Sequence, residues 1–237
     1  MHFFKDEGVV LRKYRIKEKD EVVILLTKHH GKMAFVSYGS RDAKSRKAGA
    51  LQLANTIEFQ ARETKTKMPN LEQVKGLKRR AFELFKDQSI ELFYRASEIL
   101  KLAHVYSQEG EKVLQGYLDL NSALDQVDLP SIVCIFWIRL LTDHGFLPDW
   151  SHCQRCHIKI SLQEKTYFST KNNGFSHQKC SPSDQERSRS KADSVIDPNL
   201  LKLMSYFQHS SISQSIRVDA DQNLLQDIYG LLGSIEV

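Results

Sequence analysis

The spacing of apolar residues changes at about Arg80, and this change divides the chain into a strand-rich part and a helical part. Before Arg80, short runs of β-branched and aromatic residues are separated by polar or glycine-containing turns, which is typical of strands. After Arg80, apolar residues recur at steps of three and four, which is typical of amphipathic helices. The sequence therefore predicts an α+β chain whose strands come first.

Five strand candidates precede residue 80. They are residues 8–16, 22–27, 33–38, about 50–60 and, less clearly, 72–78. Five short strands in about eighty residues favour a small barrel such as an OB-fold. An SH3-like barrel would give a similar pattern, so the spacing alone does not choose between them.

Helix candidates follow at residues 82–103, 113–124 and 132–141, and two shorter ones lie around residues 198–208 and 224–232. Residues 132–141 are apolar on nearly every face, so we expect this helix at the centre of the helical core, ended by Gly145 and Pro148. Residues 181–194 are polar and lack aromatic side chains, and we predict a flexible loop there.

The net charge of +5 conceals an asymmetry. Residues 1–80 hold nineteen Lys and Arg against nine Asp and Glu, a net charge of +10, whereas residues 81–237 carry a net charge of −5. Such a difference suggests that the first third binds a polyanion such as nucleic acid. A solvated basic surface without a partner is the alternative.

The cations of the first third are the candidate nucleic-acid contacts, and four of them lie with one acid in the loop 39–47. Four aromatic residues, Tyr14, Phe35, Tyr38 and Phe59, are candidates for base stacking. Each is more simply explained as barrel core. The predicted contacts are Arg12, Lys13, Lys28, Lys32, Arg41, Lys44, Arg46 and Lys47.

Two ligand pairs follow the helices: Cys153-Gln154-Arg155-Cys156 and His177-Gln178-Lys179-Cys180. Zinc prefers four tetrahedral thiolate or imidazole ligands, and two ligands three positions apart on a tight turn can share one ion. We expect Gly174 to allow the tight turn of the second pair. The sequence predicts a closed structural zinc site that crosslinks a hairpin and performs no chemistry.

Other roles for these residues remain open. A redox Cys-x-x-Cys normally opens a helix beside a strand, and a disulfide is disfavoured in the cytoplasm. Catalytic zinc keeps an open coordination position, whereas four protein ligands are available here. His152 and His157 flank the first pair and could compete as ligands, and Cys134 is expected to be a small core residue.

No arrangement of residues predicts catalysis, because the chain lacks a Walker phosphate loop, a paired carboxylate motif and a nucleophile elbow. His29 and His30 are expected to be surface residues of a turn. No apolar run is long enough to span a membrane and the start of the chain lacks a signal core, so we expect a cytoplasmic protein.

Several stretches of the chain, in a fixed order, form a pattern that is more specific than any one motif. The stretches are Gly8-Val9-Val10-Leu11-Arg12, Lys19-Asp20-Glu21-Val22-Val23, Leu25-Leu26-Thr27-Lys28-His29-His30-Gly31-Lys32, Gly39-Ser40-Arg41, Lys44-Ser45-Arg46, Gly49-Ala50-Leu51-Gln52, Trp137-Ile138-Arg139-Leu140-Leu141 and Gly145-Phe146-Leu147-Pro148. They continue into Cys153-x-x-Cys156 and into Phe168-Ser169 before Gly174. Together they resemble the RecO family of bacterial recombination mediators, and the resemblance covers residues 8 to about 180.

The resemblance implies a fold of four parts. It places a five-stranded OB-fold barrel that binds nucleic acid at residues 1–80 and an α-helical domain at residues 81–150. A zinc-binding segment is inserted at residues 151–182. A loop and C-terminal helices that pack onto the helical domain follow at residues 183–237.

The resemblance also implies a function without enzymatic turnover. Family members bind single- and double-stranded DNA at the nucleoid and anneal complementary strands. With RecR they help load the RecA recombinase onto strands coated by single-stranded-DNA-binding protein, whose acidic C-terminal tail they contact. Arg41, Lys44 and Arg46 then fall in the DNA-binding region, and Arg139 is a candidate contact for the acidic tail.

The second ligand pair departs from the family, which commonly has another Cys-x-x-Cys where this chain has His177-x-x-Cys180. Imidazole can replace thiolate as a zinc ligand, so Cys153, Cys156, His177 and Cys180 remain the expected metal ligands. The alternative function is a protein–protein adaptor with a structural zinc and only incidental DNA binding.

Overall fold

The computed structural model describes residues 2–42, 44–64, 68–86, 89–111, 114–161, 163–169, 172–180 and 193–235. The chain forms two compact units, Met1–Phe136 and Trp137–Val237, and the boundary falls within a helix. The loop predicted at residues 181–194 lies outside the described residues up to residue 192, as does Val113 at the start of the second predicted helix.

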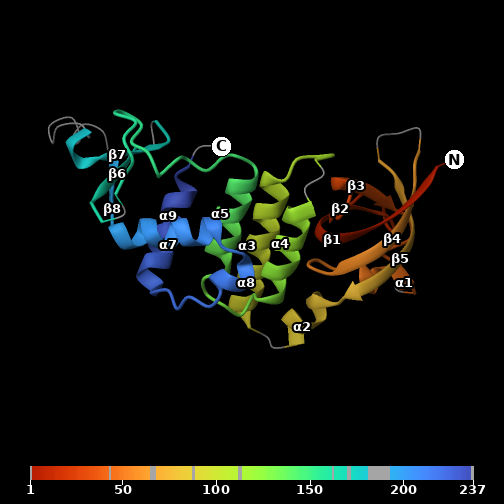
Figure 1. The fold of residues 1–237 in the computed structure, drawn as a ribbon. Helices are drawn as coiled ribbons and strands as arrows, with labels where there is room; N and C mark the ends of the chain where they lie inside the picture. Colours follow the sequence, from red (N-terminus) through yellow and green to blue (C-terminus); the bar gives the residue numbers. More distant parts are fainter. Residues whose placement is uncertain are drawn as a thin grey trace. The chain divides into compact units, whose positions relative to one another are not determined.

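Five strands of the first unit form a closed barrel in the order β1-β2-β3-β5-β4, with β4 pairing back onto β1 (Figure 1, red to orange). The pairing of β3 with β5 is parallel and the other pairings are antiparallel. The prediction of a five-stranded N-terminal sheet is confirmed. The strands are β1 Phe3–Arg15, β2 Glu21–Thr27, β3 Gly31–Ser37, β4 Thr56–Arg62 and β5 Asn70–Lys78.

The fourth predicted strand, at residues 50–60, was wrong in its first half. Arg46–Ala50 forms the short helix α1, whose Ser45 cap accepts a hydrogen bond from the backbone N–H of Lys47. The chain then turns at Ala54, which has a left-handed φ of 67°, before β4 begins. Ala50 and Leu51 gave a strand-like signal because they are buried in the barrel core, but they enter it from a helix and its end.

The barrel core contains two of the four aromatic residues that were candidates for base stacking. Phe35 and Phe59 are fully buried and meet edge to face, with ring centroids 5.0 Å apart. Tyr14 and Tyr38 are exposed. Only the two tyrosines therefore remain as stacking surfaces among the four candidates.

Three helices follow the barrel within the first unit, and a fourth crosses into the second. They are α2 Arg80–Lys86, α3 Ile90–Tyr106, α4 Leu114–Asp125 and α5 Ile132–Asp143. The single helix predicted at residues 82–103 is thus divided, because Ser89 caps α3 by accepting a hydrogen bond from the backbone N–H of Leu92.

The barrel and the chain between α3 and α4 approach closely at Gly31. This residue has a left-handed φ of 70°, and a Cβ there would lie 2.0 Å from the carbonyl oxygen of Glu111. Lys32 follows and donates its Nζ to the carbonyl of His104 at 2.7 Å. Any side chain at position 31 would push α3 and its following loop away from the barrel.

Arg80 joins the barrel to α4 through a buried guanidinium. Its Nη1 donates to Thr56 Oγ1 at 2.7 Å and to the carbonyl of Ala54 at 3.2 Å, both on the barrel side. On the α4 side, Nε donates to Asp125 Oδ1 at 2.8 Å and Nη2 to Asn121 Oδ1 at 3.0 Å. The guanidinium therefore satisfies polar groups of both elements at once.

Asp6 holds the turn between β2 and β3. Its carboxylate is fully buried and lies 2.8 Å from His29 Nδ1 and 2.7 Å from His30 Nδ1. It also accepts hydrogen bonds from the backbone N–H groups of Glu7 and His29. The two histidines, expected to be plain surface residues, thus also form hydrogen bonds with a buried acid.

The described residues of the second unit form a small sheet, a 3₁₀ helix and three α-helices besides the end of α5 (Figure 1, green to blue). The sheet has the order β7-β6-β8. The strand β8 and the short helix α8 were not predicted from the sequence. The elements are β6 Thr166–Ser169, β7 Gly174–His177, the 3₁₀ helix η1 Gln178–Cys180, β8 Asp193–Ile196, α7 Pro198–His209, α8 Ile212–Ser215 and α9 Gln222–Gly233.

Side chains of α5, α7 and α9 form the core of this unit. Leu201, Met204, Phe207 and Ile228 are fully buried, and Trp137 meets Tyr229 edge to face at 5.3 Å. Among the residues that the structure describes, no helix combines the length and apolar character that crossing a membrane requires.

Arg80→Ala is expected to lower the free energy of unfolding by about 3 kcal/mol, because it leaves Asp125, Asn121 and Thr56 without their buried donor. Urea denaturation measures this loss. Arg79→Ala removes the neighbouring exposed arginine and should change the free energy by less than about 0.5 kcal/mol. Equal losses for the two variants would contradict the role of Arg80.

Asp6→Asn is expected to reduce stability at neutral pH by about 2 kcal/mol, the range of hydrogen bonds to charged groups. Burial raises the pKa of Asp6, but the hydrogen bonds from His30, His29 and the backbone lower it overall. The contribution of the carboxylate is therefore complete above the unfolded pKa of about 3.9 and is lost as pH falls through the lower folded pKa.

Unfolding free energies measured from pH 7 down to pH 2 should show the wild type losing its advantage over Asp6→Asn below about pH 4. The exposed Asp227→Asn is the control and should follow the wild type throughout. An advantage that persists unchanged to pH 2 would show that the carboxylate charge does not matter.

Candidate metal centre and nucleic-acid surface

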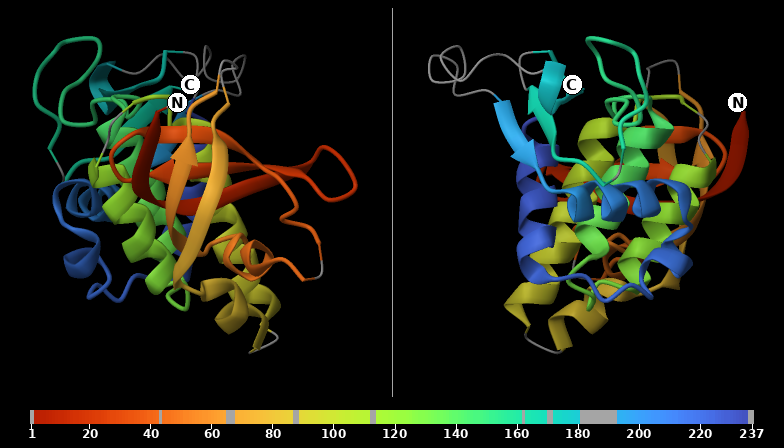
Figure 2. Two further views of the ribbon diagram at one scale, coloured as in Figure 1. Left: turned by 90° about the vertical axis from the view of Figure 1, so that its right-hand side faces the viewer. Right: turned by 60° about the vertical axis from the view of Figure 1, so that its left-hand side comes forward.

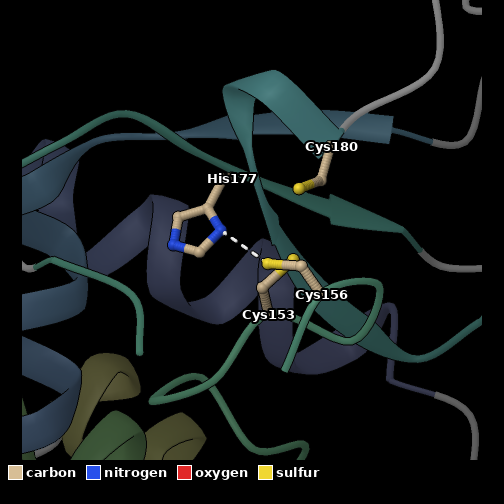
Figure 3. A group of neighbouring side chains, drawn as sticks. All are labelled: Cys153, Cys156, His177 and Cys180. Atoms are coloured by element: carbon tan, nitrogen blue, oxygen red, sulfur yellow. Dashed lines mark hydrogen bonds between the residues drawn. The ribbon is translucent and has the colours of Figure 1, made fainter. Parts of the chain in front are cut away.

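The structure brings the four predicted metal ligands together in the second unit. The ligand atoms of Cys153, Cys156, His177 and Cys180 all lie within 4.8 Å of one another (Figure 3). A tetrahedral zinc with Zn–S bonds of about 2.3 Å keeps its sulfurs roughly 3.8 Å apart. The four atoms thus lie where one ion could contact all of them.

The first pair lies on a tight turn that closes on itself. The backbone N–H of Cys153 donates to the carbonyl of Ile158 at 2.9 Å, and that of His157 donates to the carbonyl of Cys153 at 2.8 Å. His157 has a left-handed φ of 58°. The turn curls the chain around Cys153, which is fully buried, and directs the sulfur of Cys156 to the same point.

The second pair is built differently from the expected tight turn. His177 ends β7 and Cys180 ends η1, so a 3₁₀ turn separates the two ligands. The left-handed residue before β7 is Asn173, with φ 45°, so the expectation that Gly174 makes the turn was wrong. Gly174 instead lies in β7 beside the side chain of Gln154, whose Oε1 would lie 2.5 Å from a Cβ at position 174 and would have to move.

The orientation of His177 prepares one ring nitrogen for a metal. Its Nε2 lies 3.2 Å from the carbonyl oxygen of Lys159, and its Nδ1 lies 3.4 Å from the sulfur of Cys156. Because a carbonyl only accepts, Nε2 carries the hydrogen in this contact and Nδ1 carries the lone pair. The free lone pair therefore points at the cluster.

The thiols of Cys153 and Cys180 differ in acidity because their surroundings differ. Burial raises the pKa of Cys153, but backbone N–H groups donate to its sulfur and lower that pKa to about 6. The neighbouring Cys156 raises the pKa of Cys180 to about 11, and burial adds to this. A divalent cation would remove the repulsion between thiolates and allow all three to ionise.

Residues that could have competed for the metal lie outside this cluster. His152 Nδ1 pairs with Asp149 at 3.0 Å, and His157 is exposed on the turn. Cys134 is buried in α5, where burial raises its thiol pKa to about 12. The donor set of three thiolates and one imidazole fits a closed tetrahedral site.

Aromatic residues form a small core around the ligands. Phe168 and Phe175 are fully buried with ring centroids 4.9 Å apart, and Trp150 meets Phe175 edge to face at 6.3 Å. The strands and turns of this segment are short, so a metal ion bound by the four ligands would add to its cohesion.

Four of the eight predicted nucleic-acid contacts are occupied within the first unit. Lys13 pairs with Glu21 at 3.7 Å and Lys28 with Glu7 at 3.5 Å. Lys32 and Lys47 donate to backbone carbonyls at 2.7 Å, and burial lowers the pKa of both. These four lysines are partly buried and have partners within the unit, so their role as DNA contacts stays a prediction.

Arg12, Arg41, Lys44 and Arg46 are the exposed members of the set. Arg12 lies over the ring of Tyr14, 4.8 Å from its centroid. The other three lie on the loop after β3 and the start of α1, whereas Arg12 lies within β1. The loop residues therefore form the denser group of exposed cations.

The loop packs against the turn of the β1–β2 hairpin, which projects from the barrel (Figure 2, left). Gly39 donates its N–H to Asp20 Oδ1 at 2.9 Å, and Arg41 donates to the carbonyl of Glu18 at 2.9 Å. Lys19 pairs with Asp42 at 3.2 Å. The contact adds two exposed lysines that were not predicted, and we call the combined set the basic edge: Lys17, Lys19, Arg41, Lys44 and Arg46.

Comparison with known proteins gives matches along most of the chain. The family model described as "Recombination protein O N terminal" matches residues 1–80, and that described as "Recombination protein O C terminal" matches residues 87–235. A "DNA repair protein RecO" of Acetivibrio thermocellus is 25% identical over 235 residues, covering 96% of this chain and 88% of the relative. Proteins of the same name are 25% identical in Bacillus pumilus, covering 96% and 86%, and 27% identical in Bacillus velezensis, covering 94% and 84%.

Cys156→Ser is expected to reduce the zinc content of purified protein and to lower its melting temperature by roughly 5 °C or more, because each lost kcal/mol shifts a chain of this size by about 2–4 °C. Atomic absorption and thermal denaturation measure the two effects. Cys134→Ala is the control, since it removes a cysteine outside the cluster and should leave the zinc content unchanged. Unchanged zinc and melting temperature in Cys156→Ser would contradict the assignment.

Proposed function

Since the chain belongs to the RecO family of DNA repair proteins, we propose that it binds single- and double-stranded DNA and anneals complementary strands as a recombination mediator. The observation that carries this proposal is the basic edge. Its five cations lie on one hairpin turn and the loop packed against it, and Asp42 pairs with only one of them.

The topology of the barrel supports its assignment as an OB-fold. This fold is a small five-stranded Greek-key barrel that binds oligonucleotides. The strand order β1-β2-β3-β5-β4, the parallel pairing of β3 with β5 and the helix α1 between β3 and β4 agree with it. In this assignment Lys17 and Lys19 of the basic edge lie on the loop between the first two strands, which such barrels use for binding.

Annealing follows from charge neutralisation. Two complementary strands repel each other through their phosphates, and cations that contact both strands lower that repulsion while bases pair. Lys and Arg on flexible stems contact phosphates without reading the sequence. The basic edge supplies such contacts and needs no general acid, base or nucleophile.

We extend the proposal to the partners that the family resemblance implies. With RecR, the protein would help load the RecA recombinase onto DNA coated by single-stranded-DNA-binding protein, and it would contact the acidic tail of the latter. Arg139 is a weaker candidate for that contact than its charge suggests, because its Nη1 donates to the carbonyl of Ser210 at 2.7 Å. The tail would compete with this internal bond.

We assign the Cys153, Cys156, His177 and Cys180 cluster to a structural zinc. When bound, zinc would supply charge compensation and a crosslink between the first turn and β7, with no open position for a substrate. Lys159 would keep the imidazole in the required tautomer. The proposal therefore includes no catalytic step.

Replacing Arg41, Lys44 and Arg46 together with Ala is expected to weaken DNA binding and slow annealing. Each phosphate contact on a single strand contributes about 0.7 to the slope of log affinity against log salt, so three lost contacts flatten the slope by about 2. Fluorescence anisotropy over a salt series measures the slope, and mixing of labelled complementary oligonucleotides measures annealing.

The control replaces Lys101, Lys165 and Lys202 with Ala, which removes the same charge from exposed positions outside the barrel. It should leave the slope unchanged. If both triple variants behave like the wild type, DNA lies elsewhere and the adaptor function gains support.

A further inference from the structure

A cavity of about 480 Å³ lies beside the barrel in the first unit. This volume falls within the roughly 300–1,000 Å³ of small-molecule sites. The residues around it come from α1, the turn after α1 and the start of α2. They are Gly49, Gln52, Asn55, Arg79, Ala81 and Phe82.

Asn55 fixes one wall of the cavity. Its Nδ2 donates to the carbonyls of Gly49 and Ala50 at 3.1 Å, and its Oδ1 accepts from the backbone N–H of Ala81 at 3.0 Å. The side chain is buried, and these bonds tie α1 to α2. The wall is therefore already in place before any ligand binds.

Phe82 presents an aromatic ring at the cavity mouth. Its side chain is 70% exposed although it is a large apolar group, and nearby Leu53 is exposed as well. When the flat ring of a ligand stacks on an exposed phenylalanine beside a cavity, the stacking stabilises the complex of protein and ligand. Phe82 thus indicates a planar ligand.

Arg79 supplies a cation on the same cavity. Its Nε lies 3.5 Å from the position that a Cβ on Gly76 would take, so the side chain lies over the bare backbone of β5. Within the described residues, no hydrogen bond or ion pair occupies its guanidinium, in contrast to Arg80 next to it. Arg79 is therefore free to contact an anion.

The cavity and the basic edge share the helix α1, which carries Arg46 of the edge and Gly49 of the cavity wall. Arg46 and Gly49 are three positions apart on this helix and so lie on the same side of it. A strand that follows Lys44 and Arg46 therefore reaches Gly49, and with it the cavity, within one helical turn. Cations at both ends favour an occupant that carries phosphates and a planar ring.

We propose that the cavity binds one unstacked base of a DNA single strand, with Phe82 stacking on the base and Arg79 contacting a neighbouring phosphate. This inference rests on the proposed DNA binding and specifies its substrate. A base inside a duplex is already stacked on both faces, so the cavity distinguishes single-stranded from double-stranded DNA.

Phe82→Ala tests the stacking contact. We expect it to weaken binding of an oligodeoxythymidine roughly 10-fold, within the range of one lost stacking contact, and to leave the salt slope unchanged. Affinity for a duplex of the same length should stay within about twofold of the wild type. Arg79→Ala should instead reduce the slope by about 0.7.

Two further variants sharpen the result. Phe82→Trp keeps an aromatic face, so it should retain affinity and show quenching of its fluorescence by the oligonucleotide, above the background of the buried Trp137 and Trp150. Ile90→Ala removes an exposed apolar side chain of α3 that does not line the cavity, and it should bind like the wild type.

Three outcomes would overturn the inference. Equal losses for single strand and duplex in Phe82→Ala would indicate a general structural effect. Normal DNA binding in Phe82→Ala, while the Arg41, Lys44 and Arg46 triple variant fails to bind, would refute the base site and leave the proposed function intact. If Phe82→Ala then lost binding to a partner protein instead, the cavity would be a protein-docking site. A wild type that binds no DNA would refute both proposals.

Discussion

The guanidinium of Arg80 is the contact on which the arrangement of the first unit depends. It bonds on one side to the barrel, at Thr56 and the carbonyl of Ala54, and on the other to Asn121 and Asp125 of α4. A lysine could not make these bonds, because its ammonium group lacks the planar fork of donors. Since Arg80 also begins α2, its position determines where Arg79 and Phe82 project. A buried residue with a structural role thereby orients two exposed residues that we assign to DNA.

The parts of the structure that the sequence predicted are those that depend on local residue patterns. The strand candidates before residue 80 and the long apolar helix at residues 132–141 follow from side-chain periodicity, which each segment carries by itself. The four ligands Cys153, Cys156, His177 and Cys180 were identified because metal-ligand spacing is also local within each pair. Family resemblance then favoured an OB-fold over an SH3-like barrel, a choice that periodicity could not make.

The failures share a physical cause, namely a partner distant in sequence. Ala50 and Leu51 suggested a strand because burial alone does not distinguish a helix end that enters a barrel from a strand within it. Gly174 suggested a turn, but the space it leaves is filled by Gln154, twenty residues earlier. The sequence also does not show which basic side chains have partners within the protein. Lys32 and Lys47 donate to the carbonyls of His104 and Leu71, contacts that no local pattern reveals.

The balance between phosphate contacts and base stacking determines what kind of DNA-binding protein this can be. In the proposed function, phosphate contacts at the basic edge would hold either strand and would not hinder pairing, because phosphates face away from the partner base. A base stacked on Phe82 is withheld from pairing, at a gain of roughly 1–3 kcal/mol. Each base-pair step returns on average about 1.4 kcal/mol, so two or three new steps suffice to draw a single held base into the duplex. Many stacking sites would trap the strand, whereas one site per chain is compatible with annealing.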